Sequence, residues 1–507
     1  LDLSSLDGTN GFALNGVAAN DLAGTMVSSA GDFNGDGIAD MIVGASSADP
    51  NGVSNAGQTY VVFGQDGGFG ASIDLSSLDG ANGFAIGGLD PNDNAGNAVS
   101  SAGDVNNDGY DDLIVGAFQG DPNGQTNAGE AYLIYGNGDP MAAAVDPSTL
   151  DGTNGTLLTG IAAGSEAGRA VSGAGDVNGD GIADIVIGAP KANFDSGEAY
   201  VVFGQTGGLG AEFDLSTLDG TNGFTIVGAR GQTGLTVSSA GDVNGDGFDD
   251  ILIGAPYADS NGMMNAGEAY LVFGQDGGFA DTINLAQLDG QNGFVIDGAQ
   301  LDFDRLGGSV SGAGDINGDG FDDMIVGSDL ADPNNLADGG QSFVIYGRDF
   351  HGEVTHQGTA TSDLLVGGAG DNIMVGGQGD DFLNGGGGMD VLIGGAGNDV
   401  FQVADGAARL IKGGAGEDMV IVDGGSLSLD LGAMPVEGIE IIDISGSGDN
   451  TLTLDVLDVL GASDTTNVLK VLGDLGDQVN ATGGWVADGT MVDGGVTFNV
   501  YTSGEAT

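Results

Sequence analysis

The 507-residue sequence contains no cysteine, which excludes disulfide bonds, thiolate metal sites and cysteine nucleophiles. Only 8 residues are lysine or arginine, against 74 aspartates and glutamates, and the formal net charge is −66. Nucleic acid and anionic membranes are bound through basic clusters, so both are excluded as partners. No apolar run reaches the roughly 18 residues of a membrane-spanning helix, so we expect no membrane insertion. A surface this acidic attracts cations.

Catalytic motifs are also missing. The two histidines, His351 and His356, are five residues apart and do not match the H-E-x-x-H zinc motif. There is no G-x-S-x-G nucleophile elbow. Carboxylate pairs occur throughout the chain, so none stands out as a general acid and base. The sequence therefore predicts that the protein is not an enzyme and has no catalytic residues.

Glycine is abundant, with 103 residues, about three times its average share. It shows no collagen-like period, so the glycines are expected in turns. The length allows two to four domains, and the 40% of hydrophobic residues allow a sizeable core. No secretory signal is visible and the chain opens on Leu1, which we interpret as a processed product or an excerpt.

A nine-residue acidic motif, first found as DFNGDGIAD at Asp32–Asp40, occurs five times. Oxygen ligands at positions one, three, five and nine, with glycine at position six for a sharp turn, suit calcium, which takes six to eight oxygens. The backbone carbonyl of position seven would complete each set. The predicted ligands are Asp32, Asn34, Asp36, Ile38, Asp40, Asp104, Asn106, Asp108, Tyr110, Asp112, Asp176, Asn178, Asp180, Ile182, Asp184, Asp242, Asn244, Asp246, Phe248, Asp250, Asp315, Asn317, Asp319, Phe321 and Asp323.

These motifs are not EF-hands. An EF-hand needs flanking helices and a bidentate glutamate at position twelve, and position twelve here is apolar in all five copies, as at Val43. The plainer alternative is an Asx-rich turn without metal. Three aspartates within nine residues repel one another unless a cation is present, which favours the calcium loop.

The motif belongs to a longer repeat. LDLSSLDGTNGFAL at Leu1 recurs in variant form at Ile73, Val145, Phe213 and Ile283. Each unit holds four short runs rich in β-branched and aromatic residues and bounded by Gly, Asn or Asp, which predicts four strands. In the first unit the runs begin at Gly11, Thr25, Asp40 and Gln58. Radial repetition of such units predicts a β-propeller of about five four-stranded blades over residues 1–350. A solenoid is the weaker alternative, because its repeats usually run to roughly 20–45 residues.

The stretch VSSAGDVNGDGFDDILIGAPYAD, from Val237, resembles the FG-GAP repeat of integrin α-subunit propellers and their bacterial relatives. The resemblance implies four-stranded blades, calcium loops on one face, and other loops that bind partners. Members of that family usually have seven blades. With five units here, the alternatives are that five blades close alone, that further blades are missing upstream, and that a neighbouring chain supplies them.

A second repeat, of period nine, fills residues 351–421 and includes GGQGDDFLN from Gly376. The pattern G-G-x-G-x-D-x-U-x resembles the calcium-binding repeat of RTX (haemolysin-type) proteins and predicts a parallel β-roll. A flexible glycine linker is the alternative, but the copies stay in phase. Asn372 replaces the aspartate of the first copy. The predicted calcium-site residues are Gly376, Gly379, Asp381, Gly385, Gly388, Asp390, Gly394, Gly397, Asp399 and Asp418.

Residues 422–507 are expected to be rich in β-strands, with one short helix in LDVLDVLGAS from Leu454. The region resembles the segment that closes large RTX adhesins and surface proteins. The resemblance implies a cap for the roll or part of an export signal. RTX proteins generally leave the cell by type I secretion and fold outside it, where calcium is abundant.

The combined prediction is a secreted, extracellular or cell-surface protein that depends on several structural calcium ions. It would act in adhesion or as a self-assembling structural unit, without catalysis. Its partners would be calcium ions together with copies of itself or a cell-surface or matrix molecule. The alternative is an extracellular hydrolase that uses the propeller as a scaffold with structural calcium. A carbohydrate- or ice-binding adhesin module is a weaker option.

Overall fold

The computed structural model describes residues 2–138, 140–298, 303–404, 406–463, 468–493, 496–503 and 506. The chain divides into two compact units. Unit 1 comprises Leu1–Gly241, Phe248–Gly312 and Met324–Ile345, and unit 2 comprises Asp242–Gly247, Ala313–Asp323 and Tyr346–Thr507. Apart from turns and short 3-10 helices, the regular structure of the described residues is β-strand, with two short helices, α1 (Ala192–Asp195) and α2 (Val456–Ala462). The domain limits expected at residues 350 and 421 stay predictions.

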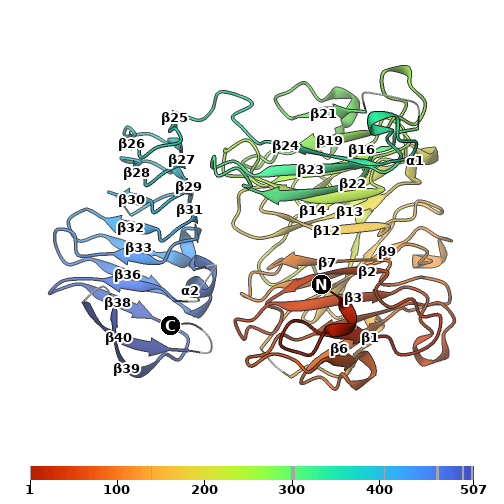
Figure 1. Ribbon diagram of the computed structural model, residues 1–507, viewed down its shortest axis with the longest axis horizontal. Helices are drawn as coiled ribbons and strands as arrows, with labels where there is room; N and C mark the ends of the chain where they lie inside the picture. The colour runs from red at the N-terminus through yellow and green to blue at the C-terminus, as the bar shows by residue number, and fades with distance from the viewer. Residues whose placement is uncertain are drawn as a thin grey trace. The chain divides into compact units, whose positions relative to one another are not determined.

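Unit 1 carries five propeller blades, which follow the colour gradient from red to green in Figure 1. From the inner to the outer strand, the first blade is β2 (Met26–Gly31), β3 (Asp40–Ala45), β4 (Gln58–Val62), β6 (Gly83–Gly87) and β10 (Ala144–Val145). The second is β7 (Ala98–Gly103), β8 (Asp112–Ala117), β9 (Glu130–Ile134), β11 (Gly155–Thr159) and β15 (Glu212–Asp214). The third is β12 (Ala170–Gly175), β13 (Asp184–Ala189), β14 (Glu198–Val202), β16 (Gly223–Val227) and β20 (Thr282–Asn284).

The last two blades have fewer strands. The fourth is β17 (Thr236–Gly241), β18 (Asp250–Ala255), β19 (Glu268–Val272) and β21 (Gly293–Asp297). The fifth is β22 (Leu306–Gly314), β23 (Asp323–Ser328) and β24 (Gln341–Ile345). A separate two-stranded sheet pairs β1 (Ala13–Asn15) with β5 (Ser72–Asp74).

The sequence repeat and the blade are not the same unit. All four runs of the first repeat are strands, as predicted, but β1 does not join β2, β3 and β4. A blade takes its first three strands from one repeat, an antiparallel fourth strand from the next repeat, and, in the first three blades, a parallel fifth strand from the repeat after that. The expected four strands per blade are therefore exceeded in three blades. This exchange ties successive repeats together through backbone hydrogen bonds.

The blade cores lie between neighbouring sheets. Strands β8, β13 and β18 are buried along their whole length, because blades pack against both of their faces. Their sequences are accordingly continuous apolar runs, such as the Leu113–Val115 stretch, instead of the alternation found in half-exposed strands. These central strands begin at the last residue of each acidic motif and so fix its position.

Unit 2 contains the predicted parallel β-roll, whose turns stack from β25 to β38 in Figure 1. One sheet is β25 (His356–Gln357), β27 (Ile373–Gln378), β29 (Val391–Ala396), β31 (Leu410–Ala415) and β34 (Val436–Glu437). The other is β26 (Leu364–Val366), β28 (Phe382–Asn384), β30 (Val400–Val403), β32 (Met419–Val422), β35 (Ile441–Asp443) and β37 (Lys470–Leu472). Leu383 and Phe401, at the apolar position of the nonapeptide, are fully buried between the sheets.

The C-terminal region continues this architecture. Both roll sheets run past residue 421 through β34, β35 and β37. A third parallel sheet is formed by β33 (Ser428–Asp430), β36 (Thr451–Leu454) and β38 (Gln478–Ala481). Strands β39 (Val486–Asp493) and β40 (Val496–Thr502) form an antiparallel hairpin. Helix α2 lies where the short helix was predicted. Among the described residues, no helix is both long and apolar enough to cross a membrane.

Candidate metal centres

Each acidic motif forms the loop between the first and second strands of a blade, as β2 and β3 flank Asp32–Asp40. The predicted placement between two strands, without flanking helices, is therefore confirmed. Side-chain oxygens of the motif accept hydrogen bonds from backbone N–H groups of the same loop. Asp32 accepts the backbone N–H groups of Asp36 at 3.0 Å and Gly37 at 2.8 Å, and Asn34 Oδ1 accepts that of Asp36 at 2.9 Å. The side-chain oxygens of positions one and three thus meet at the same backbone group.

The aspartate at position nine is buried and begins the second strand. Asp40 Oδ2 accepts the N–H of Phe33 at 3.1 Å, and Asp40 Oδ1 accepts that of Gly64 at 2.7 Å. The same two bonds recur at Asp112, Asp184 and Asp323. A carboxylate oxygen can accept more than one bond, so these contacts leave acceptor capacity for a cation.

The loops concentrate negative charge, and none of the five motifs supplies a basic residue of its own. Burial first, and then the nearby Asp32 and Asp36 carboxylates, raise the pKa of Asp40 to about 7. Burial, followed by the neighbouring Asp104 and Asp108, raises the pKa of Asp112 to about 8. No lysine or arginine occurs in any of the five motifs. A divalent cation would favour the ionised carboxylates, which fits the oxygen-rich donor set that calcium prefers.

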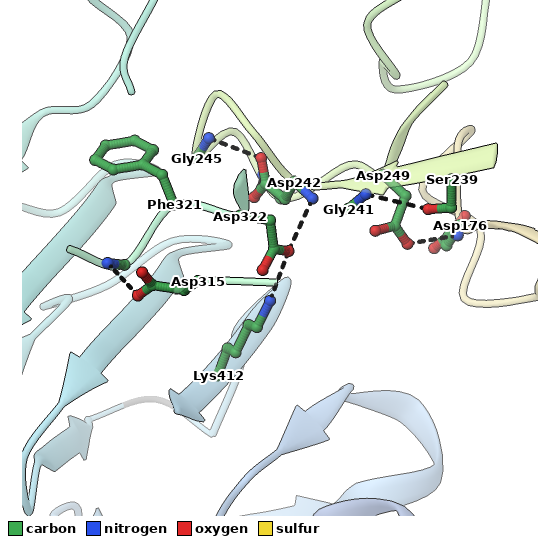
Figure 2. Close-up of polar contacts among 12 residues, drawn as sticks. Asp176, Ser239, Gly241, Asp242, Gly245, Asp249, Asp315, Phe321, Asp322 and Lys412 are labelled. Atoms are coloured by element: carbon green, nitrogen blue, oxygen red, sulfur yellow. Dashed lines mark hydrogen bonds and ion pairs between the residues drawn. The ribbon is translucent and has the colours of Figure 1, made fainter. Parts of the chain in front are cut away.

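Neighbouring loops are joined by a residue that was not predicted to matter. Asp111, at position eight, accepts the N–H of Asp32 in the preceding loop at 2.7 Å. In the same way Asp249 accepts the N–H of Asp176 at 2.8 Å, and Asp322 accepts that of Asp242 at 3.1 Å (Figure 2). The sequence feature that could have identified position eight is the pair of adjacent aspartates that ends the second, fourth and fifth motifs.

Position seven contributes packing as well as its predicted backbone carbonyl. A Cβ added at Gly35 would lie 2.2 Å from the ring of Tyr110, and one at Gly179 would lie 2.2 Å from the ring of Phe248. The aromatic side chain therefore covers the glycine of the preceding loop, and only glycine allows that approach. Gly245 and Phe321 repeat the arrangement.

Unit 2 holds an ion pair on the fifth loop. Lys412 Nζ, on β31, lies 3.0 Å from Asp322 Oδ2, the atom that also accepts from Asp242 (Figure 2). Burial alone would lower the pKa of Lys412, but the charges of Asp322 and Glu437 outweigh it and raise the pKa above its ordinary value. Asp322 thus links two acidic loops to a lysine of the roll strand.

The aspartates of the roll form a ladder along the stacked turns. Asp381 Oδ1 accepts the N–H of Asp363, and Asp399 Oδ1 accepts the N–H of Asp381, both at 2.7 Å. Asp418 Oδ1 accepts the N–H of Asp399 at 2.6 Å. The other carboxylate oxygens of Asp381 and Asp399 are buried and have no hydrogen-bond partner among the described residues. Burial, then the neighbouring aspartates, raises the pKa of Asp399 to about 6.

These buried oxygens fit a cation, because a buried acceptor without a partner is costly. The glycines beside them cannot be replaced without a clash. A Cβ at Gly376 would lie 2.5 Å from Asp381 Oδ2, and one at Gly394 would lie 2.3 Å from Asp399 Oδ2. Outside this ladder, a Cβ at Gly385 would lie 2.0 Å from Asp390 Oδ2. Gly379, Gly388 and Gly397 have φ values of 107°, 125° and 142°, which L side chains rarely adopt.

Two residues of the ladder were not predicted from the nonapeptide pattern. Asp363 lies 18 residues before Asp381, one full turn of the roll, and Glu440 Oε2 accepts the N–H of Asp418 at 2.8 Å. The spacing of one turn could have identified Asp363. Asn372, the predicted weak position, donates its side-chain N–H to Asp390 Oδ1 at 3.0 Å. It lies on the opposite side of the roll from the ladder.

In the described part of the chain, no group of three or more histidine, aspartate or glutamate side chains converges as a ready-made metal cage. The predicted calcium ligands also include asparagine side chains and backbone carbonyl oxygens, which are not counted in a group of histidine, aspartate and glutamate side chains. The donor chemistry therefore fits calcium, while the ligand role of each predicted residue stays a prediction.

The fold and these sites define a protein built from calcium-loop propeller blades and a calcium-binding parallel β-roll. Family models match accordingly. The FG-GAP repeat matches residues 25–62, 95–134, 167–202, 233–272 and 306–345. The RTX calcium-binding nonapeptide repeat matches residues 357–392, 366–401 and 384–407. The chain therefore carries five FG-GAP repeats and a set of RTX calcium-binding repeats, which confirms both predicted resemblances.

Several characterised proteins are similar to parts of the chain. Phosphatidylinositol-glycan-specific phospholipase D of Bos taurus is 32% identical over 219 residues, which are 42% of this chain and 24% of that protein. Integrin alpha-PS2 of Drosophila melanogaster is 27% identical over 46% of this chain and 16% of its own length. Integrin alpha-5 of Xenopus laevis is 29% identical over 45% of this chain and 19% of its own length. The similarity thus spans a quarter or less of each relative.

Proposed function

We propose that this protein is secreted, works outside the cell, and acts in adhesion or as a self-assembling structural unit that depends on several structural calcium ions. The burial of the loop carboxylates carries the proposal. The position-nine side chains Asp40, Asp112, Asp184, Asp250 and Asp323 are at most 1% exposed in motifs that contain no basic residue. Each recognised loop and full nonapeptide turn would hold roughly one ion.

Calcium would stabilise the fold because the sites exist only when the chain is folded. Binding free energy then adds to the free energy of unfolding. The loops lack the helices and the position-twelve glutamate of a sensor, so the ions act as permanent structural links. Cysteine is absent, and the ions take the stabilising role that disulfide bonds have in many secreted proteins.

An adhesive or assembling role is supported by the similarity to integrin α chains and by the repetition of the unit. Repeats present an extended interaction surface more readily than a single reaction centre. The partners proposed are copies of the same chain or a cell-surface or matrix molecule. No catalytic function is proposed for this surface, and type I secretion is proposed as the export route on the basis of the RTX repeats.

The test is thermal unfolding of the purified chain in calcium, in EGTA, and in EGTA with excess magnesium. We expect EGTA to lower the apparent Tm by about 10 °C or more, since several sites each contribute a few kcal/mol. Re-addition of calcium restores the original Tm, and magnesium does not. Identical unfolding with and without EGTA would contradict the proposal.

A second candidate is the extracellular hydrolase with a propeller scaffold and structural calcium. The similarity to the bovine phosphatidylinositol-glycan-specific phospholipase D favours it, although only 24% of that protein is matched. Its test is a turnover assay of the calcium-loaded chain on phosphatidylinositol glycan and on general hydrolase substrates. Turnover above that of a boiled control would support the hydrolase and contradict the non-catalytic proposal.

A further inference from the structure

The turns of the β-roll satisfy the polar side chain at the aspartate position in two different ways. On the ladder side, Asp381 Oδ2 and Asp399 Oδ2 are buried and accept no hydrogen bond among the described residues. A Cβ placed on Gly376 would lie 2.5 Å from Asp381 Oδ2 and 2.6 Å from Gly394 O, so the carboxylate oxygen lies beside a carbonyl of the next turn. Neither oxygen carries a hydrogen, so Asp381 Oδ2 needs a cation at this place.

On the opposite side of the roll, Asn372 fills the equivalent place with its own amide group. The side-chain nitrogen donates to Gly370 O, to Gly385 O at 3.1 Å and to Asp390 Oδ1 at 3.0 Å. The residue is 8% exposed, so these contacts are shielded from water. In the nonapeptide register, the three oxygens correspond to those of Gly379, Gly394 and Asp399 around Asp381.

The orientation of this amide is fixed by a fourth contact. Asn372 Oδ1 accepts the backbone N–H of Gly368 at 3.3 Å, which leaves the nitrogen facing the three oxygens. An aspartate at position 372 could not make these contacts, because a carboxylate has no hydrogen to donate. The amide nitrogen of Asn372 therefore stands where the aspartate turns need a cation.

Thr359 supplies the donors for the aspartate that precedes Asn372 on the ladder side. Asp363 Oδ2 accepts the backbone N–H and the hydroxyl of Thr359, both at 2.7 Å. Later turns have glycine at this position, and Gly377 and Gly395 have φ values of 99° and 102°, which threonine rarely adopts. Asp363 Oδ2 is thus paired within its own turn, whereas Asp381 Oδ2 is not.

We infer that the roll turn formed by residues 358–372 is closed by protein donors in place of calcium, and that calcium binding on the roll begins at the turn of Gly376. Thr359 and Asn372 are the residues that exclude the ion. The inference rests on the calcium dependence in the proposed function and specifies which turns need calcium. The closed turn offers β25 and β26 as calcium-independent strands with which β27 and β28 pair.

Asn372→Asp in the full-length chain should open a closed site. The variant should bind about one calcium ion more per chain than the wild type, counted by atomic emission after gel filtration in calcium. In EGTA its apparent Tm should be about 5 °C or more below that of the wild type, because an unpaired buried charge replaces a satisfied amide. Calcium should abolish this difference.

The control for the added charge is Asn480→Asp, the same change at an exposed position of β38, which should gain no ion. Equal calcium counts for Asn372→Asp and the wild type would overturn the inference. So would a loss of Tm that calcium does not restore. A gained ion in the control as well would assign the gain to charge alone and would also overturn it.

The reciprocal change, Asp381→Asn, places an amide in the turn where calcium binding is inferred to begin. It should bind about one ion fewer than the wild type, and its Tm in EGTA should be about 3 °C or more above that of the wild type. Asp381→Ala removes the same ligand without supplying a donor and should gain no stability in EGTA. A Tm of Asp381→Asn in EGTA no higher than that of Asp381→Ala would contradict the inference.

Thr359→Gly should allow about one further ion to bind at Asp363, because it removes the hydroxyl and restores the glycine of the later turns. Thr359→Ser keeps the hydroxyl and should bind as many ions as the wild type. A gained ion in both variants, or in neither, would overturn the role of Thr359.

The outcome is separable from the test of the proposed function. A wild type that calcium stabilises, with an Asn372→Asp variant that gains no ion, would overturn the closed turn and leave the calcium dependence standing. A wild type with the same Tm in calcium and in EGTA, with an Asn372→Asp variant that gains an ion and is stabilised by calcium, would overturn the calcium dependence and retain the closed turn.

Discussion

The backbone N–H of Asp32 donates to Asp111 Oδ2 at 2.7 Å across 79 residues of sequence. The bond joins the first residue of one acidic loop to the eighth residue of the next. Where alanine occupies position eight, as at Ala183, the loops keep only the main-chain bond from Ala183 N–H to Asp104 O at 3.2 Å. Successive candidate calcium sites are therefore coupled to different degrees along the propeller.

Asp111→Ala should lower the free energy of unfolding by about 1–3 kcal/mol, because the charged acceptor of a partly buried N–H is lost. Position eight tolerates alanine naturally, so the variant is expected to fold. The measurement is calorimetry in saturating calcium, with Asp66→Ala as the control at an exposed aspartate. Equal Tm values for the two variants would show that the bond between the loops contributes nothing.

Glu130 provides a test of pH dependence away from the loops. It is 4% exposed and accepts the hydroxyl of Tyr132 at 2.8 Å. Burial, and then the charge of Asp93, raise its pKa from 4.5 to about 7. The folded state therefore binds the proton more tightly than the unfolded state, and the stability of the wild type falls as pH rises from about 4.5 to 7.

Glu130→Gln removes that loss, and glutamine already stands at the equivalent positions Gln58 and Gln341. The variant should match the wild type near pH 4.5 and exceed its stability by up to about 3 kcal/mol at pH 8. Unfolding followed across this pH range, with exposed Glu212→Gln as control, measures the difference. A difference that does not grow with pH would refute the assignment.

Lys412 and Asp322 should stabilise unit 2 through their ion pair. Lys412→Met leaves Asp322, whose side chain is 12% exposed, without its cation, at an expected loss of about 1–3 kcal/mol. Because the pKa of Lys412 is raised, the pair stays ionised through neutral pH and its contribution is lost only above the ordinary lysine range. Lys470→Met serves as control, since its partner Glu417 is 55% exposed, and should cost about 1 kcal/mol or less. Equal losses would contradict the distinction.

Asp399→Ala should reduce the number of calcium ions bound, because it removes a buried carboxylate that links two turns of the roll. Isothermal titration against calcium, with Asp66→Ala in parallel, gives the stoichiometry. We expect a loss of about one to two ions, since each aspartate closes a site against a neighbouring turn. Unchanged stoichiometry would remove Asp399 from the ligand set.

Much of this arrangement could be predicted from local sequence. The period-nine glycine pattern predicts the roll because a turn of two nonapeptides brings Asp381 and Asp399 into register. The strands of the repeat follow from β-branched runs bounded by Gly, Asn and Asp. Asp111 and Lys412 could not be assigned, because their partners lie 79 and 90 residues away and no local periodicity encodes such a contact.

The sequence by itself determined the repeats, the all-β class, the acidic loops and the absence of any disulfide, since each follows from residue type and spacing along a short segment. Only the tertiary structure decided how the repeats combine. In the tertiary structure β1 pairs with β5 and not with β2, β3 and β4 of its own repeat, because strand pairing depends on hydrogen bonds between segments that are distant in the sequence. Among the described residues, the five repeats therefore form five linked blades with unequal numbers of strands.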